Sequence, residues 1–150
     1  MYFLKTDEIL PPLSFDIKKY KKPEPDEESK DKTIINYKSD KQEIVVFIGA
    51  PGSGKSTFWQ NHLSDYVRVN NYLLKTKEKC LEACIEAINN GQSVVIDNTN
   101  PDKDTRAMYI SIAKEHNVPI RCFYFDCDKQ LCMHNNQQRS VNQHRKHLSK

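Results

Sequence analysis

The chain has 150 residues, of which 37% are hydrophobic and 29% are charged, and its formal net charge is +3. This length suits one domain with a usable core, and a weakly basic balance does not by itself indicate a nucleic-acid-binding protein. No stretch approaches the ~20 apolar residues of a membrane span, and the N-terminus has no basic start followed by a long apolar run. We therefore expect no membrane association, no signal peptide, and a nuclear or cytoplasmic location.

The N-terminal part has the composition of a linker. The stretch "KKYKKPEPDEESKDK" (residues 18–32) is dense in both charges and is broken by Pro23 and Pro25. Such a segment cannot bury enough apolar surface to offset its chain entropy. We expect an N-terminal segment with a charged, flexible linker over residues 1–42, a folded domain over residues 43–141, and a basic polar tail over residues 142–150.

From Glu43 onward, short β-branched runs alternate with longer amphipathic stretches. The pattern predicts strands over residues 43–49, 66–70, 93–97 and 120–126, and helices over residues 56–63, 76–89 and 102–116. Gly91 and Asn117 are suited to end the second and third helices, and Asp128 to cap a last helix that runs into the tail. This alternation predicts an α/β fold, with a parallel sheet covered by helices on both faces. Ligands of such sheets bind beyond the carboxyl ends of the strands.

Five cysteines are present, and none forms a C-x-x-C pair. Cys80 and Cys84 lie one helical turn apart, a spacing that is more typical of a packed helix face than of a metal site. We expect all five to be reduced thiols and keep a zinc site as the minor alternative.

The stretch "VVFIGAPGSGKSTF" (residues 45–58) contains the phosphate-binding pattern G-x-x-x-x-G-K-[ST] between a predicted strand and a predicted helix. Its glycines allow backbone N–H groups to point at phosphate oxygens, the lysine reaches the β- and γ-phosphates, and the serine hydroxyl suits Mg²⁺. The alternative is a glycine-rich turn that only joins strand to helix. We predict that ATP and Mg²⁺ bind here, at Gly49, Pro51, Gly52, Ser53, Gly54, Lys55, Ser56 and Thr57.

The blocks after this loop carry a more specific signal: "VVIDNTNPD" (residues 94–102), "RCFYF" (121–125) and "HNN" (134–136). With the loop, they resemble the kinase domain of the polynucleotide kinase 3′-phosphatase family over about residues 43–139. The opening "YFLKTDEILPPLSFD" looks like the segment that joins the two domains of that family. The resemblance implies a P-loop NTPase-type fold and transfer of the ATP γ-phosphate to 5′-hydroxyl ends of DNA or RNA, in strand-break repair or RNA processing. We expect a monomer whose partners are nucleic-acid ends.

The resemblance also implies roles for individual residues. Lys55 and Ser56 would hold the phosphates and the metal, and Asp97 would lie near the metal or the substrate end. Residues 98–100 would shape the adjoining turn. Arg139 would match a lid arginine that stabilises the transferring charge. The alternatives are that Asp97 caps a turn and that Arg139 lies on a solvated helix face. We expect Arg106 to be a surface helix residue.

Three departures from the family pattern predict weakened catalysis. The family base is an aspartate after the second strand, but here Asn71 and Tyr72 stand where an arginine and that aspartate are expected. A neutral tyrosine is a poor base, which leaves Asp97 as the nearest alternative carboxylate. Gln137 replaces a second lid arginine, and the resemblance stops soon after Arg139, so we expect a sheet truncated at its C-terminal end.

These departures keep a second hypothesis open, an inactive or weakened remnant that binds ATP or nucleic acid. A kinase for a small metabolite is a third possibility. Phosphatase activity is not expected, because "FYFDCDKQ" (residues 123–130) has only the first part of the D-x-D-G-T pattern. The basic tail could contact phosphate backbone, although a frayed terminus explains it as well.

Overall fold

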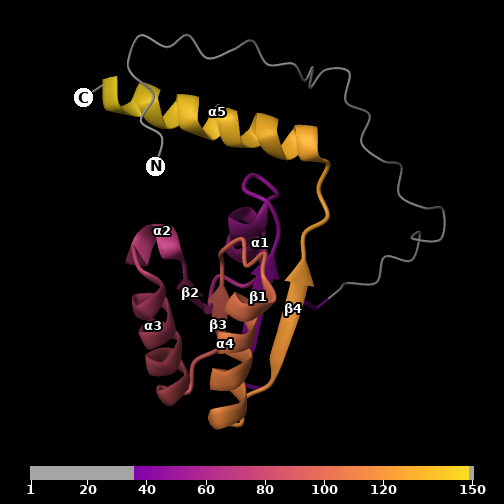
Figure 1. The fold of residues 1–150 in the computed structure, drawn as a ribbon, viewed down its shortest axis with the longest axis vertical. Coiled ribbons are helices and arrows are strands. Elements are labelled where there is room, and N and C mark those ends of the chain that lie inside the picture. Colours follow the sequence, from indigo (N-terminus) through magenta and orange to yellow (C-terminus); the bar gives the residue numbers. More distant parts are fainter. Residues whose placement is uncertain (1–35, 149–150) are drawn as a thin grey trace, which may run out of the picture.

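Four parallel strands form the sheet of the computed structural model, which describes residues 36–148 and side chains as far as Asn142 (Figure 1). Residues 1–35 and 149–150, with most of the predicted linker and the end of the tail, lie outside the described residues. The strand order is β2-β3-β1-β4. The strands are β1 (Ile44–Ile48), β2 (Val67–Val69), β3 (Val94–Ile96) and β4 (Ile120–Tyr124).

The helices are α1 (Lys55–His62), α2 (Asn71–Leu74), α3 (Lys77–Asn89), α4 (Lys103–Glu115) and α5 (Lys129–Leu148). Helices cover both faces of the sheet, which confirms the predicted α/β architecture. Within the described part of the chain, no helix is both long and apolar enough to cross a membrane.

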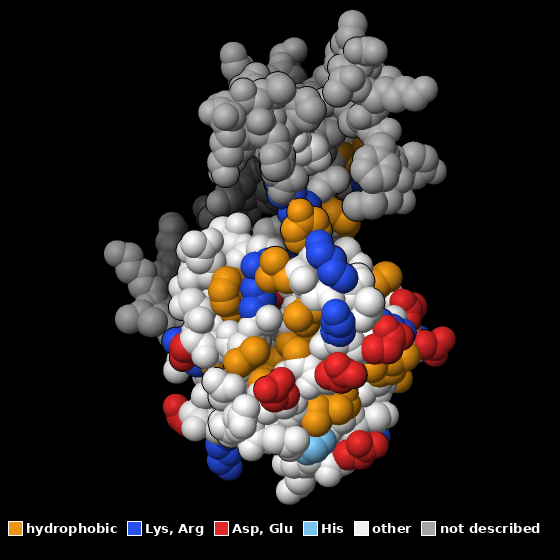
Figure 2. All heavy atoms as spheres, turned by 90° about the vertical axis from the view of Figure 1, so that its left-hand side faces the viewer, with side chains coloured by type: hydrophobic (Ala, Val, Ile, Leu, Met, Phe, Trp, Pro, Cys, Tyr) orange, Lys and Arg blue, Asp and Glu red, His pale blue; other side chains and the backbone are white. Residues whose placement is uncertain are grey.

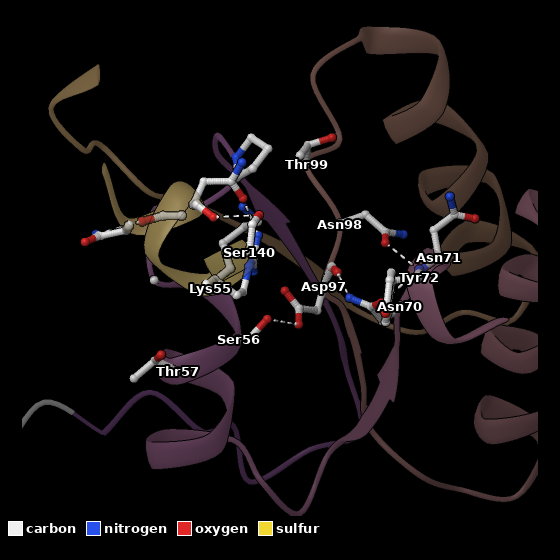
Figure 3. Close-up of a pocket in the computed structure, with 16 residues that line it drawn as sticks. Lys55, Ser56, Thr57, Asn70, Asn71, Tyr72, Asp97, Asn98, Thr99 and Ser140 are labelled. Carbon is white, nitrogen blue, oxygen red and sulfur yellow. Dashed lines mark hydrogen bonds between the residues drawn. The ribbon is translucent and has the colours of Figure 1, made fainter. Parts of the chain in front are cut away.

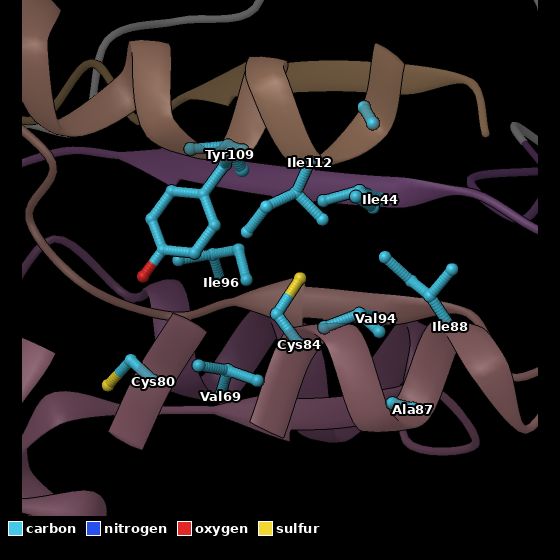
Figure 4. Packing of buried hydrophobic residues seen from close by; sticks show 12 residues of the cluster. Ile44, Val69, Cys80, Cys84, Ala87, Ile88, Val94, Ile96, Tyr109 and Ile112 are labelled. Carbon is cyan, nitrogen blue, oxygen red and sulfur yellow. The ribbon is translucent and has the colours of Figure 1, made fainter. Parts of the chain in front are cut away.

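The central strand β1 is apolar throughout because both of its faces are buried. Side chains alternate along a strand, so Ile44 and Val46 join the cluster under α3 and α4 (Figure 4), whereas Val45 and Phe47 join the one that packs against α1. Cys80 and Cys84 belong to the first cluster, together with Tyr109 and Ile112 of α4. The predicted packed cysteine face is therefore confirmed.

The helix ends follow ordinary capping chemistry. The side chains of Thr76, Asp102 and Asp128 accept hydrogen bonds from the first backbone N–H groups of α3, α4 and α5. Gly91 and Asn117, just past α3 and α4, adopt positive φ values of 75° and 54°. These starts and stops agree with the sequence prediction.

The short helix α2 was not predicted. It begins after Asn70, whose side-chain oxygen accepts hydrogen bonds from the N–H groups of Tyr72 (2.9 Å) and Leu73 (3.3 Å). Four residues are too few to show a helical period, so only the cap could have indicated this element.

The buried carboxylate of Glu43 lies at the amino-terminal end of β1, away from the predicted site. It is held by hydrogen bonds and an ion pair. Glu43 is 1% exposed and accepts hydrogen bonds from Arg121 Nε (2.7 Å) and Nη2 (2.6 Å) and from the Tyr66 hydroxyl (2.8 Å). The Arg121 guanidinium also lies 5.2 Å from the ring centroid of Phe123. The paired carboxylate raises the pKa of Arg121, and this cluster ties β1 to β4.

The carboxyl ends of the strands meet at one edge of the sheet, and α5 crosses above that edge (Figure 1). The phosphate loop follows β1, residues 70–72 follow β2, and residues 97–100 follow β3. The fold thus brings the sequence blocks of the predicted site to one place.

Candidate functional site

The phosphate loop connects β1 to α1 and depends on glycine at two positions. Gly52 and Gly54 have φ values of 83° and 94°, in the region where residues with a Cβ are strained. A Cβ on Gly52 would also lie 2.3 Å from the backbone oxygen of Cys132 in α5. The loop therefore curls at two points and packs directly under the first turns of α5.

We expect Gly52→Ala to weaken nucleotide binding, because the added methyl must push α5 away from the loop. Gly91→Ala is the matched control, since Gly91 has a similar φ of 75° but its Cβ position has no contact within 4 Å with other parts of the described structure. Urea unfolding should show that backbone strain lowers the free energy of unfolding by about 1–3 kcal/mol in either variant. Fluorescence titration with labelled ADP should show weaker binding for Gly52→Ala alone. Equal affinities for Gly52→Ala and the wild type would contradict the close packing of loop and helix.

The side-chain ammonium of Lys55 lies inside the phosphate loop. Its Nζ donates hydrogen bonds to the carbonyl oxygens of Gly49 (2.8 Å) and Ala50 (2.7 Å) and to Ser53 Oγ (3.2 Å), and the residue is 8% exposed. Burial lowers the pKa of Lys55 below its ordinary value, and the negative charge of Asp97 partly opposes this. The structure thus places the lysine cation inside the loop, where phosphate oxygens would meet it.

Ser56 and Asp97 are directly connected. Ser56 Oγ, in the first turn of α1, donates a hydrogen bond of 2.8 Å to Asp97 Oδ2 (Figure 3). Asp97 follows β3 and is 3% exposed. The carboxylate also accepts a hydrogen bond of 2.7 Å from Arg68 Nε, and Arg68 Nη2 donates one of 2.8 Å to Ser56 Oγ. The side chain of Asp97 is therefore engaged across the site, which disfavours the alternative of a simple turn cap.

Arg68 was not among the predicted site residues, although it contacts Ser56 and Asp97. It lies in β2 between Val67 and Val69, and its guanidinium packs 5.0 Å from the ring centroid of Trp59 in α1. A charged residue inside a short strand of a buried sheet was the available signal, because such charges are seldom buried without a partner. Nothing in the sequence identified Asp97 as that partner.

The donor set fits a magnesium ion in its chemistry. Mg²⁺ usually binds one or two protein oxygens and completes its shell with waters and substrate phosphates. Ser56 Oγ and Asp97 Oδ2 are hard oxygen donors that lie beside the phosphate loop. Within the described residues, no group of three or more His, Cys, Asp or Glu side chains could hold a metal by itself. These two residues would therefore hold Mg²⁺ together with the nucleotide.

A cavity of about 660 Å³ opens above the strand ends, a size that suits a nucleotide. Four segments line it. The phosphate loop and α1 contribute Pro51, Gly52, Gly54, Lys55, Ser56 and Thr57, and the segment after β2 contributes Asn70, Asn71 and Tyr72. The turn after β3 contributes Asp97, Asn98 and Thr99, and α5 contributes Asn135, Asn136, Arg139 and Ser140. The three residues predicted to be catalytic share this cavity. Two predicted loop residues, Gly49 and Ser53, do not line the cavity. Their oxygens instead accept hydrogen bonds from Lys55 Nζ.

The asparagines after β3 brace the cavity wall. Asn100 is 2% exposed, has a φ of 43°, and donates a hydrogen bond of 2.7 Å from Nδ2 to the carbonyl oxygen of Phe47. Asn98 Oδ1 accepts a 2.7 Å hydrogen bond from the N–H of Asn71, which ties this turn to α2. Arg106 donates to the carbonyl oxygens of Asn100 and Pro101, so it acts on the turn rather than in the cavity.

Helix α5 supplies the side of the cavity opposite the strands. Asn135 Nδ2 donates a hydrogen bond of 3.2 Å to the carbonyl oxygen of Gly52. Arg139 is exposed, donates a 2.6 Å hydrogen bond to Asn136 Oδ1, and lines the cavity. It is thus both solvated and placed at the site, as the lid prediction requires.

Tyr72 stands at the rim of the cavity. It is 73% exposed, and the ammonium of Lys75 lies 4.8 Å from its ring centroid. Among the described residues that line the cavity, Asp97 is the single carboxylate. If a side chain accepts a proton here, Asp97 is the group positioned to do so.

Comparison with known proteins places this chain in a family. A model described as AAA domain matches residues 71–150, just over half of the chain, beginning after the phosphate loop. The chain is 48% identical over 113 residues to a bifunctional polynucleotide phosphatase/kinase of Schizosaccharomyces pombe, a match that covers 74% of this chain and 28% of the relative. A putative bifunctional polynucleotide phosphatase/kinase of Acanthamoeba polyphaga mimivirus is 42% identical over 113 residues, covering 72% and 27%. The chain thus spans about a quarter of the length of these relatives.

Solved structures share the fold. A chain of the Pnkp1/Rnl/Hen1 complex aligns with a TM-score of 0.51 at 23% identity, over 63% of this chain and 38% of that one. The Mycobacterium tuberculosis APS kinase CysC, in complex with AMPPNP and APS, aligns with a TM-score of 0.50 at 16% identity, over 64% and 69%. These matches confirm a P-loop kinase-like sheet.

Proposed function

The chain belongs to the AAA domain family and is related to bifunctional polynucleotide phosphatase/kinases, and from this we propose that it is an ATP-dependent polynucleotide 5′-hydroxyl kinase domain. The observation that carries the proposal is the shared cavity of Lys55, Asp97 and Arg139 beside a phosphate loop. We further propose a role in DNA strand-break repair or RNA processing, in the nucleus or cytoplasm, as a monomer. The names of the relatives support the substrate class.

The phosphate loop and the cations around it account for the donor side of the reaction. The N–H groups of the loop and the N-terminus of α1 receive the β- and γ-phosphates, and Lys55 neutralises their charge. Arg139, on the opposite wall, is placed to stabilise the charge of the transferring phosphoryl group. Bound Mg²⁺ would add a further positive charge at Ser56 and Asp97.

The acceptor side of the cavity is built by α2 and the turn after β3. We infer that the 5′-hydroxyl enters between these segments, next to Asp97. The hydroxyl oxygen bonds to the γ-phosphorus as the bond to the ADP oxygen breaks, and the hydroxyl proton passes to Asp97 or to water. Figure 2 shows the face over α2 and α3, on which most basic side chains lie towards the cavity end and most acidic ones lie further from it. That distribution supports a polyanionic acceptor.

Incubation with γ-labelled ATP, Mg²⁺ and a 5′-hydroxyl oligonucleotide tests the proposal. We expect labelled oligonucleotide to accumulate, with DNA and RNA acceptors tested in parallel. Binding of ATP without transfer would support the second hypothesis, an inactive relative that retains its nucleotide site. Transfer only to small hydroxyl compounds would support a metabolite kinase.

A further inference from the structure

A guanidinium group lies against both side chains that are suited to hold magnesium. Arg68 Nη2 is 2.8 Å from Ser56 Oγ and 2.7 Å from Asp97 Oδ2. Nε of the same arginine is 2.7 Å from that same carboxylate oxygen. The oxygen pair that a metal would use is therefore already bound to a cation that belongs to the protein.

We propose that Arg68 competes with Mg²⁺ for the Ser56–Asp97 oxygen pair, so that the site takes the metal only when the guanidinium withdraws. This inference rests on the nucleotide site of the proposed function but does not require transfer to a nucleic acid. Asp97 Oδ2 already accepts hydrogen bonds from Ser56 Oγ and Arg68, so Mg²⁺ held by these two residues would compete with the guanidinium for the same oxygens. The two positive charges would also repel each other.

The charges around Asp97 strengthen this competition. Its side chain is 1% exposed, so water does not screen the pair with Arg68 effectively. Lys55 is a second cation that lines the same cavity as Asp97. One buried carboxylate thus faces two protein cations before any metal arrives, which lowers its affinity for a third.

Two features of its surroundings would stabilise the guanidinium after it leaves the oxygen pair. It packs over Trp59 at 5.0 Å from the ring centroid, and the Arg68 side chain is 25% exposed. Cation–π contact with the indole and access to solvent both stabilise a displaced guanidinium. Arg68 itself is outside the cavity lining, so its withdrawal need not block the nucleotide.

The test is the magnesium dependence of ADP binding, measured by fluorescence titration with labelled ADP at Mg²⁺ concentrations from zero to saturation. We expect Arg68→Gln to lower, by about tenfold or more, the Mg²⁺ concentration at which the change in ADP binding is half complete. A factor of this size corresponds to the loss of one charge-assisted hydrogen bond. Glutamine is neutral and can still donate a hydrogen bond to Asp97, which limits damage to the fold. Thermal unfolding of each variant checks that limit.

Arg121→Gln is the matched control, because it removes the other guanidinium–carboxylate pair with an adjacent aromatic ring, at the far end of the sheet. It should leave the magnesium dependence unchanged. Arg68→Lys provides a second variant that keeps the positive charge but loses the planar fork, and its half-maximal concentration should fall between those of the wild type and Arg68→Gln.

An unchanged or raised half-maximal Mg²⁺ concentration in Arg68→Gln would overturn the inference, because a residue that only positioned the ligands would weaken metal binding when removed. A chain that binds ADP but phosphorylates no 5′-hydroxyl end would contradict the proposed function instead. The magnesium comparison would still decide the role of Arg68 in that case.

Discussion

Lys55→Met should lower the affinity for ATP about 10- to 100-fold and reduce phosphoryl transfer by a further factor of about 10²–10³. The first effect corresponds to the loss of a charge-assisted hydrogen bond to phosphate, and the second to the loss of one preorganised positive group in the transition state. Methionine retains much of the lysine stem, so the change is mainly one of charge. Calorimetric ATP titration and a transfer assay under single-turnover conditions separate the two effects.

A loss of folding could imitate this result, because Lys55 Nζ also donates to the carbonyl oxygens of Gly49 and Ala50 within the loop. Thermal unfolding of the variant addresses this point. Lys38→Met is the control for charge alone, since Lys38 pairs with Asp65 on the surface, away from the cavity. Unaltered ATP affinity in folded Lys55→Met would contradict the assignment of the loop as the phosphate site.

Tyr72→Asp should raise the rate of transfer to a 5′-hydroxyl end by about 10²–10⁴, the usual contribution of a positioned general base. Tyr72 lines the cavity and follows β2. It is also the position at which the resemblance to the polynucleotide kinase 3′-phosphatase family predicts an aspartate. Its side chain is 73% exposed, so the substitution removes little packing. An added carboxylate in the first turn of α2 is also compatible with the positive end of the helix dipole there.

Tyr72→Asn is the matched control, because asparagine has nearly the shape of aspartate but cannot accept the proton at neutral pH. We expect no rise in its transfer rate, and unchanged ATP affinity in both variants. If Tyr72→Asn and Tyr72→Asp were equally active, the gain would come from removing the ring and not from a base. If neither variant changed the rate, the proton would go to Asp97 or to water in the wild type as well.

Much of the fold could be predicted because each element carries a local signal. The continuous apolar run of β1 predicted a strand buried on both faces, and both faces are covered. Asp102 and Asp128 indicated helix starts that the capping hydrogen bonds confirm. The helix α5 continues to Leu148, so the backbone of the basic tail is helical to that residue.

The parts that could not be predicted depend on contacts between distant segments. Nothing local to Arg68 indicates that its guanidinium reaches Asp97, 29 residues along the chain. The same holds for Gly52, which needs glycine partly because the backbone of Cys132 passes within 2.3 Å of its missing Cβ. Motif spacing located the individual groups of the site, whereas the packing of α1, β2 and α5 determines which groups meet.

The proposed kinase activity is tested most directly by transfer of the γ-phosphate from ATP to one oligonucleotide prepared in two forms, with a free 5′-hydroxyl or with a 5′-phosphate. Label should appear on the 5′-hydroxyl form alone, and a phosphatase that removes terminal phosphates should release it. The rate should fall in Lys55→Met and rise in Tyr72→Asp. No label on either form with the wild type or with Tyr72→Asp, from protein that binds ATP, would contradict a polynucleotide 5′-hydroxyl kinase.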